Sequence, residues 1–81
     1  MLILEKRYKI LKYIRNNPGT INFKMSKVID MTVSSMSLIL RDYEKRGLIE
    51  RKPIGRIKRV FITKKGLEIL KKLDRINELW K

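Results

Sequence analysis

The fold of the chain is decided by residues 25–37, which read MSKVIDMTVSSMS. Apolar side chains recur there at helical intervals, first before the turn that begins at Asp30 and again after Thr32. Thr32 is positioned to cap a new helix, because its hydroxyl can accept a hydrogen bond from a free backbone N–H of the first turn. The stretch therefore predicts two helices joined by a short turn, over residues 23–29 and 33–46.

The limits and inner faces of these two helices follow from the same pattern. Asn22 is expected to cap the first helix, and Gly47 is expected to end the second, because glycine adopts the left-handed conformation without strain. The side chains predicted to face the core are Met25, Val28 and Ile29 from the first helix and Met36, Ile39, Leu40 and Tyr43 from the second.

The segments before this pair predict one more helix and a very short strand. Residues 2–16 show helical spacing of apolar side chains, and Pro18-Gly19 ends the run. Residues 20–21 are long enough only for a single rung of a sheet.

The segments after the pair predict a β-hairpin and a last helix. Residues 48–52 and 57–62 are rich in β-branched side chains, and residues 53–56, PIGR, separate them as the tip. Thr63 is expected to cap a helix that continues to Trp80. Since a two-stranded hairpin is not stable alone, it must pack against the helices.

The resulting fold is mainly α with a small β-hairpin (α+β), and three strings within it resemble the MarR-like family. The first is residues 25–37, the second is YEKRGLIER at residues 43–51, and the third is RVFITKKG at residues 59–66. The resemblance covers roughly residues 7–73. It implies a winged helix-turn-helix, with residues 1–81 forming one DNA-binding domain.

In size and composition the chain looks most like the small winged-helix regulators of archaea and their viruses. It lacks the additional terminal helices of full-length MarR proteins, so no small-molecule effector is expected. A protein of this kind is expected to be cytoplasmic and associated with the nucleoid, or to lie inside a host cell if it is viral.

The composition excludes most catalytic and metal chemistry and indicates a polyanionic partner. The chain has 21 Lys and Arg against 8 Asp and Glu, a formal net charge of +13, and a surface this basic gathers phosphates. It has no Cys and no His, which excludes disulfides, thiolate zinc sites and histidine-based catalysis. No enzyme activity, metal or cofactor is expected, and no segment is apolar enough to predict a membrane partner.

The resemblance implies that the helix of residues 33–46 is the recognition helix, which would lie in the major groove of DNA. The positions that face away from its core stripe are the candidate contacts: Val33, Ser34, Ser35, Ser37, Leu38 and Arg41. Arg41 is the strongest reader of bases by residue type. Ser34 and Ser35 can equally serve as first-turn residues that satisfy free helix N–H groups.

The same resemblance implies that the hairpin is a basic wing, residues 51–59, that would lie on the DNA backbone or in the minor groove. Its candidate contacts are Arg51, Lys52, Arg56, Lys58 and Arg59. Further candidate contacts with the DNA backbone are Thr20, Asn22, Lys24 and Lys27. The alternative for the wing is a solvated run of charge without a partner.

The last helix, residues 64–80, carries more apolar side chains than one small core is expected to absorb, which predicts a homodimer. The residues expected at its interface are Leu2, Ile3, Ile69, Leu73, Ile76 and Trp80. A twofold axis there would set two recognition helices about one DNA turn apart, roughly 34 Å. The alternative is that the stripe packs only against residues 2–16 of its own chain.

The function predicted from these features is sequence-dependent binding of double-stranded DNA by a transcription regulator. Two other functions use the same fold. A non-specific architectural or chromatin protein would carry the same charge but show little sequence preference. A winged-helix module for protein–protein assembly would seldom need a net charge this positive.

Overall fold

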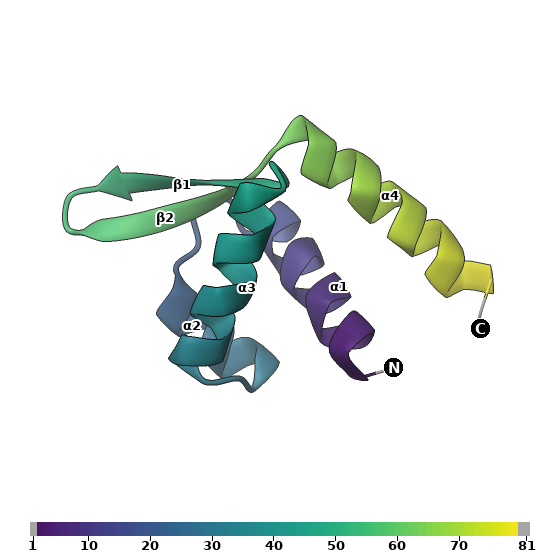
Figure 1. Cartoon of the computed structure of the whole chain (residues 1–81), viewed down its shortest axis with the longest axis horizontal. Coiled ribbons are helices and arrows are strands. Elements are labelled where there is room, and N and C mark those ends of the chain that lie inside the picture. The colour runs from purple at the N-terminus through teal and green to yellow at the C-terminus, as the bar shows by residue number, and fades with distance from the viewer. Residues whose placement is uncertain (1, 80–81) are drawn as a thin grey trace.

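The computed structural model describes residues 2–79, with side chains described within residues 5–79. Its elements, in chain order, are α1 (Leu2–Asn16), α2 (Asn22–Ile29), α3 (Val33–Lys45), β1 (Ile49–Ile54), β2 (Ile57–Ile62) and α4 (Lys64–Leu79). Figure 1 shows the hairpin projecting to one side of α1 to α3, while α4 leads away on the other. The predicted fold, mainly α with a small β-hairpin, is confirmed.

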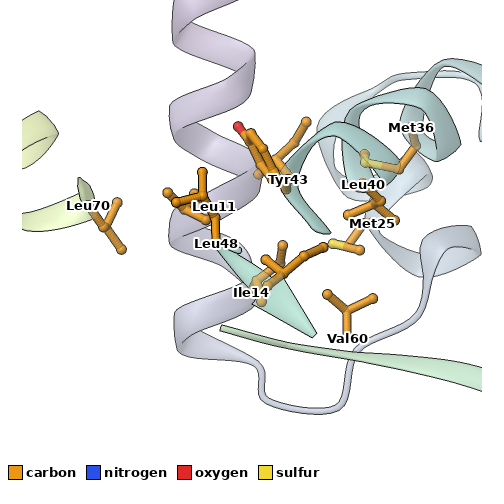
Figure 2. Close-up of a cluster of buried hydrophobic side chains, with 11 residues drawn as sticks. Leu11, Ile14, Met25, Met36, Leu40, Tyr43, Leu48, Val60 and Leu70 are labelled. Carbon is orange, nitrogen blue, oxygen red and sulfur yellow. The ribbon is translucent and has the colours of Figure 1, made fainter. Parts of the chain in front are cut away.

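One core joins all six elements, because each contributes apolar side chains to the same interior (Figure 2). Its buried members are Ile10, Leu11, Ile14, Met25, Met36, Leu40, Tyr43, Leu48, Ile49, Val60 and Leu70. Removing an aliphatic side chain of this size from water contributes about 1.5–3 kcal/mol. This core holds α2 and α3 at a set angle to α1 and to the base of the hairpin.

The sheet has two strands, where the predicted order counted three. β1 and β2 pair antiparallel from Ile49↔Ile62 to Ile54↔Ile57. The predicted first strand is a single bridge, Thr20↔Val60, as expected for a segment with room for one rung. It stays that short because the chain enters α2 at Asn22.

The tip of the hairpin is tighter than predicted. Residues 53–56 were expected to form it, but β1 continues through Ile54 and only Gly55 and Arg56 lie between the strands. Gly55 has a φ of 68°, which is typical of a two-residue turn with glycine in first place. Pro53 is tolerated inside β1 because an edge strand does not need every N–H for pairing.

Of the two helix caps predicted for α2 and α3, the structure contains only the cap of α3. The Thr32 hydroxyl accepts the Ser35 N–H at 3.1 Å, which confirms the cap of α3. Asn22 does not cap α2. It is the first residue of that helix, and its side chain donates to the Val33 carbonyl at 3.2 Å and accepts from the Ser26 hydroxyl at 2.8 Å.

The inner face of α2 is narrower than the apolar pattern suggests. Met25 and Ser26 are buried and Ile29 is half-buried, but Val28, predicted to face the core, is 59% exposed. An eight-residue helix buries one narrow stripe, and Val28 lies outside it.

The start of α4 is held by its own cap and by the end of α3. The Thr63 hydroxyl accepts the Gly66 N–H at 3.0 Å, as predicted, and donates to the Gly47 carbonyl at 2.6 Å. Gly47 has a φ of 76°, so it ends α3 in the expected left-handed conformation. One threonine therefore joins the end of α3 to the beginning of the last helix.

Candidate nucleic-acid interface

The face of α3 that points away from the core is open to solvent. Met36, Leu40 and Tyr43 are buried on the inner side, whereas Val33 is 47% and Leu38 is 64% exposed on the outer side. Of the remaining predicted contacts on this helix, Ser34, Ser35 and Arg41 are exposed and Ser37 is half-buried. The helix thus presents the six predicted side chains on one accessible surface, which we call the α3 outer face.

The polar side chains of the α3 outer face differ in the hydrogen bonds and ion pairs that they make within the protein. Ser35 takes part in the helix cap, where its N–H donates to the Thr32 hydroxyl at 3.1 Å and its own hydroxyl accepts from that hydroxyl at 2.9 Å. Arg41 has no ion pair among residues 5–79. Its guanidinium is therefore the free cation of this surface.

The far end of α3 is anchored to α1 through an acidic residue that the sequence did not single out. Asp42 accepts from Arg7 at 2.9 Å and from Arg46 at 3.1 Å. The hydrogen bonds from Arg7 and then Arg46 hold the pKa of its carboxyl below the usual range. The Tyr43 hydroxyl donates to the Arg7 carbonyl at 2.7 Å, and burial raises the pKa of Tyr43 to about 12. These contacts hold α3 on α1 directly beside the exposed Arg41.

Four of the five predicted wing residues, Lys52, Arg56, Lys58 and Arg59, are exposed. The Lys52 ammonium lies 3.7 Å from the Glu50 carboxylate, and Arg51 and Arg59 make contacts with the body of the protein. The Arg51 guanidinium donates to the Glu44 carboxylate at 2.9 Å and is only 18% exposed, and this hydrogen bond lowers the pKa of Glu44. Arg59 donates to the Gly19 carbonyl at 2.9 Å. Both arginines brace the base of the wing, so its free cations are fewer than the sequence suggested.

The residues on and beside α2 that were predicted to contact the DNA backbone also divide into exposed side chains and side chains with contacts inside the protein. Lys24 and Lys27 are exposed, but the side chain of Asn22 is occupied by Ser26 and Val33. Thr20 is 7% exposed, and its Oγ1 is buried without a hydrogen-bond partner among the described residues. Thr20 therefore presents no accessible hydroxyl for the predicted contact with a phosphate.

A neighbouring feature of α2 was not predicted from the sequence. Phe23 is 57% exposed, and the Lys27 ammonium lies 4.4 Å from the centre of its ring. The spacing of four residues on a helix was the available signal. The pair presents a cation on an aromatic face beside the start of α2.

The buried hydroxyl of Thr20 leads to a stability prediction. We expect Thr20→Val to raise the free energy of unfolding by about 1 kcal/mol, because it replaces an unpaired buried hydroxyl with a methyl group of the same shape. Thermal unfolding followed by circular dichroism should show a melting temperature roughly 4–8 °C higher. Thr20→Ser keeps the hydroxyl and should not stabilise. An unchanged or lower melting temperature for Thr20→Val would mean that this hydroxyl has a partner.

The apolar residues of α4 are largely used within the chain. Ile69 and Leu73 are half-buried against the core, and Asp74 accepts from the Tyr8 hydroxyl and from Arg15 of α1. Ile76 is 51% and Leu79 is 82% exposed. The predicted interface positions Leu2, Ile3 and Trp80 lie outside the residues whose side chains the structure describes. The apolar surface left on the described part of α4 is thus concentrated toward its C-terminal end.

Two further features bear on the classes of site that the chain can hold. No group of three or more Asp, Glu, His or Cys side chains within the described part of the chain is placed to bind a metal ion. Among residues 2–79, no helix combines the length and the apolar character needed to cross a membrane.

Comparison with known proteins gives matches in structure and none in sequence. No protein-family model matches the chain, and no curated protein matches it. The transcriptional regulator SlyA superposes with a TM-score of 0.81 at 27% identity, over 89% of this chain and 53% of SlyA. A MarR family transcription regulator superposes with a TM-score of 0.78 at 25% identity, over 91% of this chain and 52% of its own.

A third similar structure was solved with nucleic acid bound. FabT of Streptococcus pneumoniae, in complex with DNA, superposes with a TM-score of 0.81 at 24% identity, over 93% of this chain and 55% of FabT. The chain spans about half the length of these three proteins. Its likeness to them therefore concerns the part of each protein that carries the helices and the hairpin described above.

Proposed function

Since the chain folds as a winged helix-turn-helix of the MarR type, we propose that it binds double-stranded DNA and regulates transcription. The observation that carries the proposal is the α3 outer face, a solvent-exposed helix surface with a free Arg41, on a chain of net charge +13. An exposed leucine and valine on that surface fit base edges better than they fit water. FabT, which has the same fold, was solved in complex with DNA.

In this proposal α3 enters the major groove with the α3 outer face. Val33 and Leu38 touch thymine methyl groups, Arg41 donates to a guanine edge, and the serines donate to bases or phosphates. The Asp42 contact to Arg7 supports this arrangement, because it holds the helix on α1 beside Arg41. Readout by the α3 outer face is modest, since Arg41 is the single one of its six side chains able to make a bidentate contact with a guanine.

The wing supplies affinity that does not depend on sequence. Lys52, Arg56 and Lys58 neutralise phosphates on one side of α3 and release their counterions. Lys24 and Lys27 of α2 do the same on the other side, as contacts that position the protein without specifying bases.

Titration of duplex DNA at several salt concentrations, followed by footprinting on genomic fragments, tests the proposal. We expect binding that weakens steeply with salt and discrete protected sites. Uniform coating of the fragments would instead favour the architectural function. Absence of salt-dependent binding would contradict DNA binding and favour the protein–protein assembly module.

The wing residue with the clearest expected effect is Arg56. We expect Arg56→Ala to weaken binding to all sequences and to reduce the slope of log K against log salt by about 0.9, the value for a single neutralised phosphate. Arg56→Lys keeps the charge and should keep the slope. If the slope of Arg56→Ala equals that of the unmodified chain, the wing takes no part in binding.

A homodimer is the second element of the proposal. Ile76 and Leu79 leave apolar surface on α4, and pairing of two such ends would place two recognition helices on one face of the DNA, roughly 34 Å apart. We expect sedimentation at micromolar concentration to show a dimer and Ile76→Glu to shift it to monomer without loss of helix signal, since Ile76 is half exposed within its own chain. A 9.7 kDa species for the unmodified chain would contradict the dimer.

A further inference from the structure

The tip of the hairpin exposes two isoleucines that have no role in the core. Ile54 and Ile57 pair across the turn and are 53% and 45% exposed. They stand on either side of Gly55 and Arg56, at the end of the hairpin that projects farthest from the helices (Figure 1). The tip therefore carries an apolar pair directly beside a cation.

The structure separates this pair from the body of the protein. Arg51↔Val60 is the last strand pair with a buried member, and every residue from 52 to 59 is exposed. At about 3.3 Å per residue, Ile54 and Ile57 stand roughly 10 Å beyond that pair. The core therefore does not cover them.

The turn itself does not require isoleucine at these positions. A β-branched pair stabilises a hairpin through cross-strand contact, but threonine meets the same requirement and is compatible with water. Sheet edges that face solvent are usually protected by charged or polar side chains. Two isoleucines at an exposed tip therefore indicate a surface that is covered when the protein is bound.

The charges around the tip determine which partner fits it. Lys52, Arg56 and Lys58 surround the isoleucines, and residues 51–59 contain no acidic residue. A small apolar ligand would not balance these cations. The DNA minor groove does, because it combines negative potential with stacked bases between which an apolar side chain can insert.

We propose that Ile54 and Ile57 form an apolar wedge that enters the minor groove beside the α3 site, partly unstacks a base step and bends the DNA. This proposal rests on the proposed function, since it names what the wing does once the protein is bound. Arg56 lies along the groove next to the opened step and offsets the charge of the nearest phosphates. Flexible pyrimidine–purine steps such as TA are the preferred targets, because they unstack at the lowest cost.

The test uses two duplexes of about three helical turns that share one central sequence, taken by selection from a random pool with the unmodified chain. One duplex has TA steps in its flanks and the other has stiff A-tracts. Each carries a donor and an acceptor dye at its ends and 2-aminopurine in the flank. With the unmodified chain at saturation we expect energy transfer that corresponds to a bend of at least about 20° and a rise in 2-aminopurine fluorescence. Both signals should be larger on the TA duplex.

The matched variants separate apolar insertion from charge. The double variant Ile54→Thr with Ile57→Thr keeps the β-branched shape and the cations, so we expect roughly tenfold weaker binding, loss of both signals and an unchanged salt slope. Val28→Thr also replaces an apolar branch with a hydroxyl, at another exposed position, and should behave like the unmodified chain. Circular dichroism melting of the double variant checks that the fold is kept, and single Val substitutions at either position should retain part of the bend.

The outcomes distinguish the wedge from the function on which it rests. Binding by the unmodified chain without bend or fluorescence change would overturn the wedge and leave DNA binding standing. A double variant that bends both duplexes as the unmodified chain does would also overturn it. Failure of the unmodified chain to bind either duplex at low salt would overturn the proposed function itself.

Discussion

Gly66→Ala is expected to remove at least half of the free energy of unfolding of the chain. Gly66 lies in the first turn of α4, and a Cβ atom there would stand 2.1 Å from the Leu48 carbonyl oxygen and 2.7 Å from Ile62 Cγ1. The carbonyl cannot move away freely, because it accepts the Thr63 N–H at 3.0 Å. Relief of the clash would have to push α4 off the hairpin and out of the core.

The expected cost is about 3 kcal/mol or more, the upper range for an overpacked core. A domain of this size has a total stability on the order of 5 kcal/mol. Circular dichroism melts of Gly66→Ala and Gly55→Ala provide the comparison. A Cβ at Gly55 meets no described atom within 4 Å, so its cost comes only from the positive φ, about 1 kcal/mol. A Gly66→Ala melting temperature equal to that of the unmodified chain would contradict the close packing of α4 on Leu48.

Arg41→Ala is expected to weaken binding to the selected DNA site by roughly 10- to 100-fold, the range for a single bidentate base contact. Because Arg41 is exposed and has no ion pair among residues 5–79, the substitution leaves no partner charge behind. The fold should therefore be unaffected. The weakening should be smaller on scrambled DNA, where Arg41 has no guanine edge in the right place.

Competition between the selected and scrambled duplexes measures this difference. Arg75→Ala removes the same charge from an exposed position on α4 and serves as the control, with sequence preference expected to stay as it is. Arg41→Lys keeps the charge but not the two-pronged geometry, so it should restore general affinity and little of the preference. Equal weakening on both duplexes for Arg41→Ala would assign Arg41 to the DNA backbone.

The sequence by itself determined the order of the elements and the local signals that bound them. The caps by Thr32 and Thr63 and the end of α3 at Gly47 were predicted correctly, since each depends on atoms within a few residues. The core stripe of α3 was also predicted, because helical periodicity states which side chains share a face.

The tertiary structure alone decided which polar side chains of the site are free. Arg51 pairs with Glu44, and Arg59 with the Gly19 carbonyl. Thr20 was turned inward by its bridge to Val60. These partners lie 7 or 40 residues away in the chain, and no local pattern encodes such contacts. The sequence gives the number of cations in the wing, but the fold decides which of them also brace the hairpin, because Arg51 and Arg59 make hydrogen bonds to groups that are distant in the chain.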